Sequence, residues 1–490
     1  MIQGTCSNAG KSFLVAGICR ALRHEGVAVA PFKAQNMSLN SYVTLAGEEI
    51  GRAQALQAQA CGLEPLVEMN PILLKPHTQT GSQIIVLGKP VASMEARQYF
   101  AYKTSLFDTV KVSYDRLARD FDVIILEGAG SPAEINLKAH DIVNMRMARY
   151  AQASVLLTAD IDRGGAFAAL MGTMLCLEPW EQDLTTGFIL NKFRGDASLL
   201  KDALDYTTAK TDKPFWGVMP YLENLGLPEE DSVTFRESGF EQQGDKEAET
   251  LDVACVDLPH ISNITDFDAL ALEPDVRLRL VQHPHDLYAQ PPDCLILPGS
   301  KSTLADLAQL EHKGLARAIL DFAHKGGMVV GICAGFQMLG QGIGDPLKVE
   351  SGCRQKQGLG LLPMTTELGE AKRLHRLTTT HLPSGLPVVG YEIHHGRTRL
   401  GDGPALPLFE GEALVGLSNT KGNVWGAYVH GLFDSDAFRR HILDGLRQSK
   451  GLAPKGRVVA AYTVEEGLDR LAEAVREHLA WDKIRALLLG

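Results

Sequence analysis

The segment Gly4-Thr5-Cys6-Ser7-Asn8-Ala9-Gly10-Lys11-Ser12 stands almost at the start of the chain and decides the fold of its first half. A glycine-rich turn that ends in Gly-Lys-Ser and runs into a helix is typical of a phosphate-binding loop, whose backbone N–H groups point at phosphate oxygens. In such a loop Lys11 reaches the outer phosphates, and the Ser12 hydroxyl is a ligand for Mg²⁺. The candidate ATP-binding residues of this segment are Gly4, Gly10, Lys11 and Ser12.

The residues on either side of this loop support that interpretation. After it, apolar side chains recur at the spacing of a helix: Leu14, Val15, Ile18 and Leu22. Five residues separate Gly4 from Gly10, one more than in the common phosphate-loop pattern. Only three residues precede Gly4, so the sequence predicts either an unusually short first strand or a start further upstream.

Composition limits the class of protein. A chain of 490 residues is long enough for two or three domains, and 45% apolar with 22% charged residues is ordinary for a globular protein. The net charge of −11 gives no support to nucleic-acid binding. No apolar run is long enough to span a bilayer and the phosphate loop leaves no room for a signal peptide, so we expect a cytoplasmic protein with no membrane partner. The eight cysteines form no Cys-x-x-Cys pair, which favours reduced thiols.

A polar segment comes after the strand predicted at residues 27–32. Ligands of open α/β sheets bind at the carboxyl ends of the strands, and residues 33–41 lie at such an end. Their amides, hydroxyls and lysine suit a substrate that carries carboxylates or amides, although an ordinary solvated loop is the alternative. The candidate substrate-binding residues are Lys33, Gln35, Asn36 and Asn40.

Three more buried strands are predicted in the first half of the chain. Residues 122–126 end in Glu127, a candidate Mg²⁺ ligand beside Ser12, with a cap or surface acid as the alternative. Residues 154–159 end in an acidic turn, and residues 187–190 end in Asn191, which suits recognition of the edge of a purine base. Strands that alternate with helices in this way predict a doubly wound parallel sheet.

A change in amino-acid composition along the chain indicates a domain boundary. Few apolar residues occur near residues 236–250, which we interpret as a linker between a synthetase domain at 1–235 and a second α/β domain at 251–450. The second domain is also expected to be doubly wound, with strands at 251–256, 276–281, 294–297 and 328–332. In the tail, 451–490, one amphipathic packing helix is expected through Leu468, Leu471, Val475 and Leu479.

The second domain carries a nucleophile motif. Gly331-Ile332-Cys333-Ala334-Gly335 joins a strand to a helix, a turn that exposes its central side chain and places the thiol at a helix N-terminus, which favours thiolate. A buried structural cysteine is the alternative. His430, at the end of a strand predicted from residue 425, is the candidate base. A lone histidine there is more often structural or exposed, but its pairing with the elbow favours the role of a base. The candidate oxyanion donors are the backbone N–H groups of Gly299 and Ala334.

Together these motifs resemble those of the cobyric acid synthase family over nearly the whole chain. The resemblance includes residues 4–12, 32–40, 126–131, 297–303, 331–337, 390–394 and 428–433. The N-terminal half is similar to dethiobiotin synthetase-type ATP-dependent ligases, whose phosphate loop has the same longer spacing. The second half is similar to class I-type glutamine amidotransferases.

The resemblance implies a glutamine- and ATP-dependent amidation of the b, d, e and g carboxylates of adenosylcobyrinic acid a,c-diamide, giving adenosylcobyric acid in cobalamin biosynthesis. It implies ATP and Mg²⁺ as cofactors, with cobalt arriving inside the corrinoid substrate. Class I amidotransferases place a glutamate two residues after the histidine, where this chain has Leu432. The branch that this chain resembles also lacks that glutamate, and Glu392 is a candidate to orient His430 instead.

Two alternatives stay open from the sequence. One is the related amidase that modifies the a and c carboxylates of cobyrinic acid, or another glutamine-dependent ligase of the same build. The other, from a different class, is a partitioning or metallocentre-assembly ATPase, which has no need of a nucleophilic cysteine. The oligomeric state is not predicted.

Overall fold

The computed structural model describes residues 1–77, 80–228, 249–350, 353–411 and 413–490, which form two compact units. Unit 1 contains residues 1–38, 48–228 and 463–490, and unit 2 contains residues 39–47 and 249–462. The chain therefore passes from one unit to the other more often than a single linker at 236–250 would require. Of that expected linker, residues 236–248 lie outside the described residues.

A six-stranded parallel arrangement forms the centre of unit 1. Strand β1, Ile2–Gly4, pairs with β10, which continues through β11 to β12, while a bridge between Ile2 and Glu127 places β9 on the other side of β1. β9 in turn pairs with β2. In the sequence as given the first strand has three residues, and it lies in the middle of the sheet. The elements are β1 Ile2–Gly4, α1 Lys11–His24, β2 Val29–Phe32, α4 Phe107–Asp120, β9 Val123–Leu126, α5 Met145–Tyr150, β10 Val155–Asp160, α6 Ala166–Cys176, α7 Pro179–Leu184, β11 Thr185–Phe193, α8 Lys201–Thr211 and β12 Phe215–Pro220.

A smaller mixed sheet lies between β2 and α4 in the sequence. Its order is β3-β6-β7-β8, with β3 and β6 parallel and the other pairs antiparallel. The elements of this region are β3 Gln35–Met37, β5 Glu49–Gly51, α2 Arg52–Ala60, β6 Ile72–Pro76, β7 Gly81–Val86, β8 Lys89–Glu95 and α3 Ala96–Lys103. Residues 35–37 of the predicted polar segment therefore enter a second sheet instead of forming an open loop.

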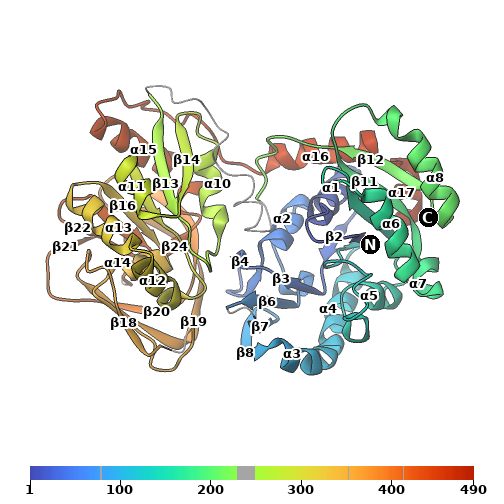
Figure 1. The fold of residues 1–490 in the computed structure, drawn as a ribbon, viewed down its shortest axis with the longest axis horizontal. Helices are drawn as coiled ribbons and strands as arrows, with labels where there is room; N and C mark the ends of the chain where they lie inside the picture. Colours follow the sequence, from blue (N-terminus) through green and yellow to red (C-terminus); the bar gives the residue numbers. More distant parts are fainter. Residues whose placement is uncertain (78–79, 229–248, 351–352, 412) are drawn as a thin grey trace. The chain divides into compact units, whose positions relative to one another are not determined.

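The C-terminal tail completes unit 1. Helix α16, Glu465–His478, packs beside α1, as Figure 1 shows in red and dark blue, and α17, Trp481–Leu489, comes next along the chain. A Cβ on Gly17 would lie 2.8 Å from Val475 Cγ2, so the glycine allows this close approach. The amphipathic helix was predicted, but the tail does not form one piece, because residues 451–462 belong to unit 2.

Unit 2 contains the second α/β sheet, in the order β14-β13-β15-β16-β23-β22-β21. The first five strands are parallel, and β22 and β21 are antiparallel additions. The four strands predicted from 251 to 332 are present at the expected positions. The elements are β4 Ser41–Val43, β13 Leu251–Val256, η6 Ile264–Phe267, α10 Asp268–Ala271, β14 Val276–Val281, α11 Pro284–Ala289, β15 Cys294–Leu297, α12 Thr303–His312, α13 Leu315–His324, β16 Met328–Ile332, α14 Ala334–Leu339, β21 Ala405–Pro407, β22 Gly416–Asn419, β23 Val424–Ala427 and α15 Asp436–Ser449.

A second sheet in unit 2 is built around a long antiparallel hairpin that we did not predict. The hairpin strands are β19, Met364–His381, and β20, Leu386–Leu400, in a sheet ordered β18-β17-β19-β20-β24. The remaining strands are β17 Gly342–Gly344, β18 Gln355–Gln357 and β24 Val429–His430. The hairpin matters for the site because β20 is the strand that pairs with β24.

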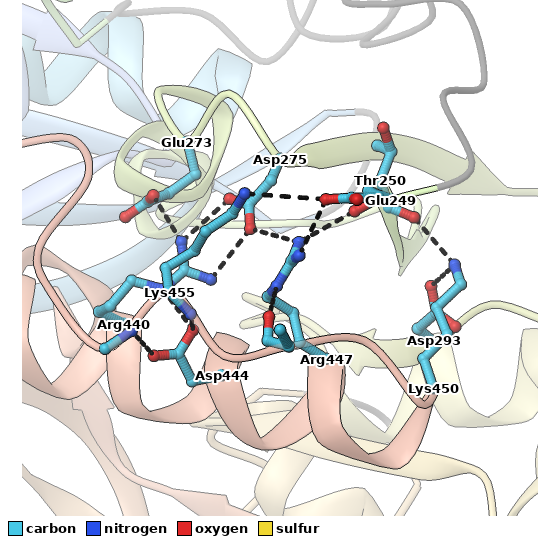
Figure 2. Close-up of polar contacts among 12 residues, drawn as sticks. Glu249, Thr250, Glu273, Asp275, Asp293, Arg440, Asp444, Arg447, Lys450 and Lys455 are labelled. Carbon is cyan, nitrogen blue, oxygen red and sulfur yellow. Dashed lines mark hydrogen bonds and ion pairs between the residues drawn. The ribbon is translucent and has the colours of Figure 1, made fainter.

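Helix α15 is fixed by buried ion pairs, part of which Figure 2 shows. Arg440 and Arg447 both contact Asp275, and Arg440 also contacts Glu273. Arg439 is fully buried and donates to Glu273 Oε1 at 2.8 Å. The carboxylates come from the segment before β14, so the network joins α15 to the edge of the parallel sheet.

None of the helices in the described ranges is long and apolar enough to cross a bilayer.

Candidate active sites

The phosphate loop has the backbone that its glycines predict. β1 leads into the loop and α1 begins at Lys11, directly after Gly10. Gly10 has a φ of +87°, and a Cβ there would lie 2.0 Å from the Nδ2 atom of Asn191. Glycine is therefore required at this position for both conformation and space.

The end of β9 meets the start of α1. Ser12 Oγ donates a hydrogen bond to Glu127 Oε1 at 2.9 Å, so the two candidate metal ligands lie together as expected. Lys11 Nζ donates to the carbonyl oxygens of Cys6 and Gly130, at 2.9 and 3.3 Å. The loop lysine thus lies between the phosphate loop and the glycine-rich turn after β9.

Glu127 is the centre of a buried polar cluster. Its side chain is fully enclosed, and Lys33 Nζ donates to Oε1 at 2.8 Å. Gln57 and Gln54 of helix α2 donate to Oε2 at 2.6 and 3.4 Å. A hydroxyl and a carboxylate are the hard oxygen donors that Mg²⁺ prefers, so Ser12 and Glu127 fit that ion.

Two glutamines of this cluster were not among the predicted site residues. Gln54 and Gln57 stand three positions apart in an alanine-rich helix, and both are fully buried. Buried side-chain amides need hydrogen-bond partners. Two glutamines in the alanine-rich segment 52–60 therefore indicate a polar group nearby, and this was the available signal. Glu127, 70 residues after Gln57, is their partner.

The side chain of Asn191 contacts the backbone of the phosphate loop. Its Nδ2 donates to the carbonyl of Ala9 at 2.9 Å, and the adjacent Lys192 donates from Nζ to the carbonyl of Asn8 at 2.8 Å. Both residues belong to the end of β11. This contact supports the loop directly and leaves the expected contact with a purine base as a prediction.

The four candidate substrate-binding residues are divided between the units. In unit 1, Lys33 contacts Glu127, Gln35 Oε1 accepts the hydroxyl of Tyr99 at 2.5 Å, and Asn36 donates to Gln54 at 2.9 Å. These three are buried, not part of a solvated loop. Asn40 belongs to unit 2, where its Oδ1 accepts the N–H of Ile264 at 3.1 Å.

Cys333 has the strained backbone of a nucleophile elbow, with φ +51° and ψ −103°. The turn joins β16 to α14. A Cβ on Gly331 would lie 2.6 Å from the backbone nitrogen of Phe336, and one on Gly335 would lie 2.0 Å from the Leu297 carbonyl oxygen. Both flanking glycines are therefore required, as the motif predicted. The expected exposure of the thiol was wrong, because Cys333 is buried. Cys333 Sγ lies 3.6 Å from the carbonyl oxygen of Ile393.

His430 lies beside Cys333 and is held from the other side by Asp266. Its Nδ1 is 2.7 Å from Asp266 Oδ2, and its ring is close enough to Cys333 for the thiol to influence the pKa of His430. Burial alone would lower the pKa of His430, but the negative charges of Asp266 and of a Cys333 thiolate raise it to about 10. This geometry is compatible with a nucleophile, a proton carrier and a carboxylate that orients it.

Two expectations around His430 were wrong. The predicted single strand from Trp425 is two strands, because the chain leaves the parallel sheet after β23 and enters the hairpin sheet as β24. Glu392 does not orient His430, since its carboxylate oxygens contact Arg373 at 2.8 Å and His394 at 3.2 Å. Along β20 side chains alternate in direction, and Tyr391, not Glu392, pairs with His430.

The two candidate oxyanion donors lie at this elbow. Ala334 is the first residue of α14, so its N–H has no acceptor within the helix. A Cβ on Gly299 would lie 3.0 Å from His430 Cε1, which places the backbone of Gly299 against the imidazole. Both backbone positions are compatible with binding a developing oxyanion.

Asp266 is a further candidate functional residue, one that was not predicted from the sequence. It lies in the η6 turn that comes after β13, and its Oδ1 also accepts the N–H of Gly431 at 2.7 Å. The available signal was a polar run, Ser262-Asn263-Ile264-Thr265-Asp266, shortly after a strand whose carboxyl end faces the same sheet edge as the elbow.

Comparison with known proteins gives the same two-part division. Residues 1–235 match the model of the CobQ/CobB/MinD/ParA nucleotide binding domain, and residues 252–438 match that of the CobB/CobQ-like glutamine amidotransferase domain. The chain is 52% identical to a cobyric acid synthase of Nitratidesulfovibrio vulgaris, covering 100% of this chain and 97% of that protein. It is 49% identical to one of Pelotomaculum thermopropionicum, covering 100% and 96%.

A third relative is longer. The adenosylcobalamin biosynthesis bifunctional protein CobDQ of Leptospira interrogans is 51% identical over the whole of this chain, which covers 57% of that protein.

Proposed function

The chain belongs to the cobyric acid synthase family, a glutamine-hydrolysing carbon–nitrogen ligase family of cobalamin biosynthesis, and we propose that its substrate is adenosylcobyrinic acid a,c-diamide. The b, d, e and g carboxylates of that corrinoid become amides, giving adenosylcobyric acid. The observation that carries the proposal is the pairing, in one chain, of a phosphate loop with a Cys333–His430–Asp266 arrangement. One arrangement suits carboxylate activation and the other suits release of ammonia.

Activation of the carboxylate needs a phosphoryl group. A carboxylate oxygen attacks the γ-phosphorus of ATP, the bond to the β,γ-bridging oxygen breaks, and an acyl phosphate and ADP form. Ammonia then attacks the acyl carbon and phosphate leaves, so each amide consumes one ATP. Lys11 and the backbone N–H groups of residues 4–12 hold the phosphates during this transfer.

A magnesium ion fits the same place. Ser12 and Glu127 would hold it through their oxygens, and when bound it neutralises phosphate charge. Lys33 balances the charge of Glu127. When Mg²⁺ is bound to Glu127, Lys33 would be able to contact a substrate carboxylate instead. Lys33, Gln35 and Asn36 are the proposed acceptor-binding residues, and Asn191 is proposed to lie near the base of ATP.

Ammonia comes from glutamine in unit 2. Cys333 Sγ attacks the side-chain amide carbon of glutamine, and the N–H groups of Ala334 and Gly299 stabilise the oxyanion. His430 passes a proton to the departing nitrogen, so ammonia leaves and a thioester remains. Water then hydrolyses the thioester to glutamate. Because both ATP and glutamine are cytoplasmic metabolites, we place the reaction in the cytoplasm.

Mass spectrometry of the corrinoid product tests the proposal. The protein is supplied with ATP, Mg²⁺, glutamine and either adenosylcobyrinic acid a,c-diamide or cobyrinic acid. We expect the diamide to gain four amides and cobyrinic acid to gain none at its a and c positions. Conversion of cobyrinic acid to its a,c-diamide, with the diamide itself left unchanged, would assign the protein to the earlier amidation instead.

A further inference from the structure

A short segment of the N-terminal half is built into unit 2. Residues 39–47 come directly after the acceptor-binding segment of unit 1 along the chain, yet they belong to the glutamine-hydrolysing unit. Asn40 and Ser41 are each 1% exposed and Val43 is fully buried. These residues are core positions of unit 2, so their contacts there have consequences for its site.

The first contact holds the turn that carries Asp266. Asn40 Oδ1 accepts the N–H of Ile264 at 3.1 Å, and the N–H of Ser41 donates to Asn263 Oδ1 at 3.1 Å. Asn263 has a φ of +53° and opens the η6 turn. Two hydrogen bonds from the segment therefore hold Asn263 and Ile264, the residues that begin the turn. They stand three and two positions before Asp266.

The second contact reaches His430 through Tyr391. The Tyr391 hydroxyl donates to the carbonyl of Ser41 at 3.1 Å, and Tyr42 packs edge-on against its ring at 5.1 Å between centroids. The same Tyr391 ring stacks on His430 at 5.6 Å. The segment thus holds the ring against which the imidazole lies.

The third contact reaches Cys333 through Ile393. Val43 forms an apolar cluster with Tyr391 and Ile393, and its carbonyl accepts a hydrogen bond from Arg376 Nε at 2.9 Å. The Ile393 carbonyl oxygen is the group that lies 3.6 Å from Cys333 Sγ. All three groups of the site therefore have a neighbour that this segment positions.

We propose that Asn40, Ser41, Tyr42 and Val43 are positioning residues of the glutamine-hydrolysing site. This inference rests on the proposed function and deepens it. The N-terminal sequence contributes to both reactions: residues 33–36 serve the acceptor site, and the four residues after Leu39 hold the geometry of glutamine hydrolysis. Asn40, which its sequence context assigned to the corrinoid, instead acts through the Asp266 turn.

The test is Asn40→Ala in the full chain, with glutamine hydrolysis and ammonia-driven amidation measured separately. Removal of one buried hydrogen-bond acceptor is expected to lower kcat for glutamine hydrolysis roughly 10-fold, with the KM for glutamine unchanged. The high-pH limb of the kcat profile should move to lower pH, because a displaced Asp266 holds the imidazolium less firmly. Ammonia-driven amidation should not change, and Asn40→Asp, which keeps the acceptor, should restore hydrolysis.

The matched control is Asn419→Ala, which removes a side-chain oxygen that accepts the Val424 N–H in the same unit. We expect it to leave both activities unchanged. Unchanged hydrolysis in Asn40→Ala, or loss of ammonia-driven amidation alone, would overturn the inference and return Asn40 to the acceptor site. If Asn40→Ala does not fold, Asn263→Gly carries the same test, since glycine keeps the positive φ and removes the acceptor of Ser41. The proposed function is tested separately: ammonia-driven amidation of adenosylcobyrinic acid a,c-diamide by the parent chain supports it whatever the Asn40 variants do, and no amidation of that corrinoid would overturn it.

Discussion

Asp266 holds His430 and the residue after it with the same carboxylate: Oδ2 lies 2.7 Å from His430 Nδ1, and Oδ1 accepts the N–H of Gly431 at 2.7 Å. This two-point contact fixes both the ring and the backbone that carries it. The sequence has Leu432 at the position where the resemblance to class I-type amidotransferases led us to expect a glutamate. Leu432 is tolerated because Asp266 supplies the carboxylate from a turn elsewhere in the fold.

Asp266→Asn should therefore disable glutamine hydrolysis. Loss of the charge that stabilises the imidazolium is expected to lower kcat roughly 10²- to 10⁴-fold. The pKa of His430, now about 10, should fall, so the high-pH limb of the rate profile moves to lower pH. A raised pKa of His430 in the folded state also stabilises the fold. This stabilisation is fully present at pH values below the ordinary histidine pKa and is lost as the pH rises through the folded-state pKa, and the variant should lack it.

Glu392→Gln is the control for that experiment. Its carboxylate contacts Arg373 and His394, not His430, so hydrolysis should stay within a few-fold of the parent and its pH profile should not move. If the Glu392 variant loses hydrolysis while Asp266→Asn keeps it, our assignment of the orienting carboxylate is incorrect.

Cys333→Ser should separate the two half-reactions. Without the thiol, glutamine-driven amidation is expected to fall roughly 10⁴-fold or more, while ammonia supplied in solution still supports product formation. Product is counted by mass spectrometry with each nitrogen source in turn. Cys353→Ser, an exposed cysteine in the same unit, is the matched control and should change neither rate. Full glutamine-driven turnover in Cys333→Ser would rule out the nucleophile.

Glu127→Gln should affect the other half-reaction. The change keeps the shape of the side chain but removes the charge that pairs with Lys33 and accepts from Ser12. We expect ATP-dependent amidation with ammonia to fall roughly 100-fold or more, and the Mg²⁺ concentration for half-maximal rate to rise. Asp115→Asn removes an exposed carboxylate of the same unit, one that contacts Tyr150, and should leave both quantities unchanged. Equal rates in the two variants would exclude Glu127 from the metal site.

The residues that sequence reasoning found are those whose signal is local. Cys333 is recognisable because the two glycines that its elbow requires stand within two positions of it, and Gly10 because its loop is contiguous. Asp266 has no such signal, since 164 residues separate it from His430 and only the folded chain brings them together. A short polar run after a strand contains many candidates and does not say which one faces the imidazole.

Asn40 shows a different limit. Position after a strand end predicted a role in the acceptor site for four residues of segment 33–41, and three of them, Lys33, Gln35 and Asn36, do lie in unit 1. Nothing in the pattern indicates that the chain changes units after Ser38. The long hairpin of β19 and β20 was not predicted, for a related reason. Exposed charged side chains, such as Arg373 and Arg397, interrupt the apolar alternation of its strands.

Arg439→Met tests how α15 is held. Arg439 is fully buried, pairs with Glu273, and donates to the carbonyl oxygens of Phe433 and Ala460 at 2.7 and 2.5 Å. Removal of one partner from a buried ion pair costs about 3–5 kcal/mol. Here Glu273 keeps only its contact with Arg440, and the carbonyls of Phe433 and Ala460 lose their donor. For a unit of this size the midpoint of thermal unfolding should fall by roughly 10 °C in calorimetry. Arg317→Met breaks an exposed pair with Asp321 in the same unit and should shift the midpoint by no more than about 2 °C, since surface pairs contribute little. Equal shifts in the two variants would mean that the buried pair adds no more to stability than the surface one.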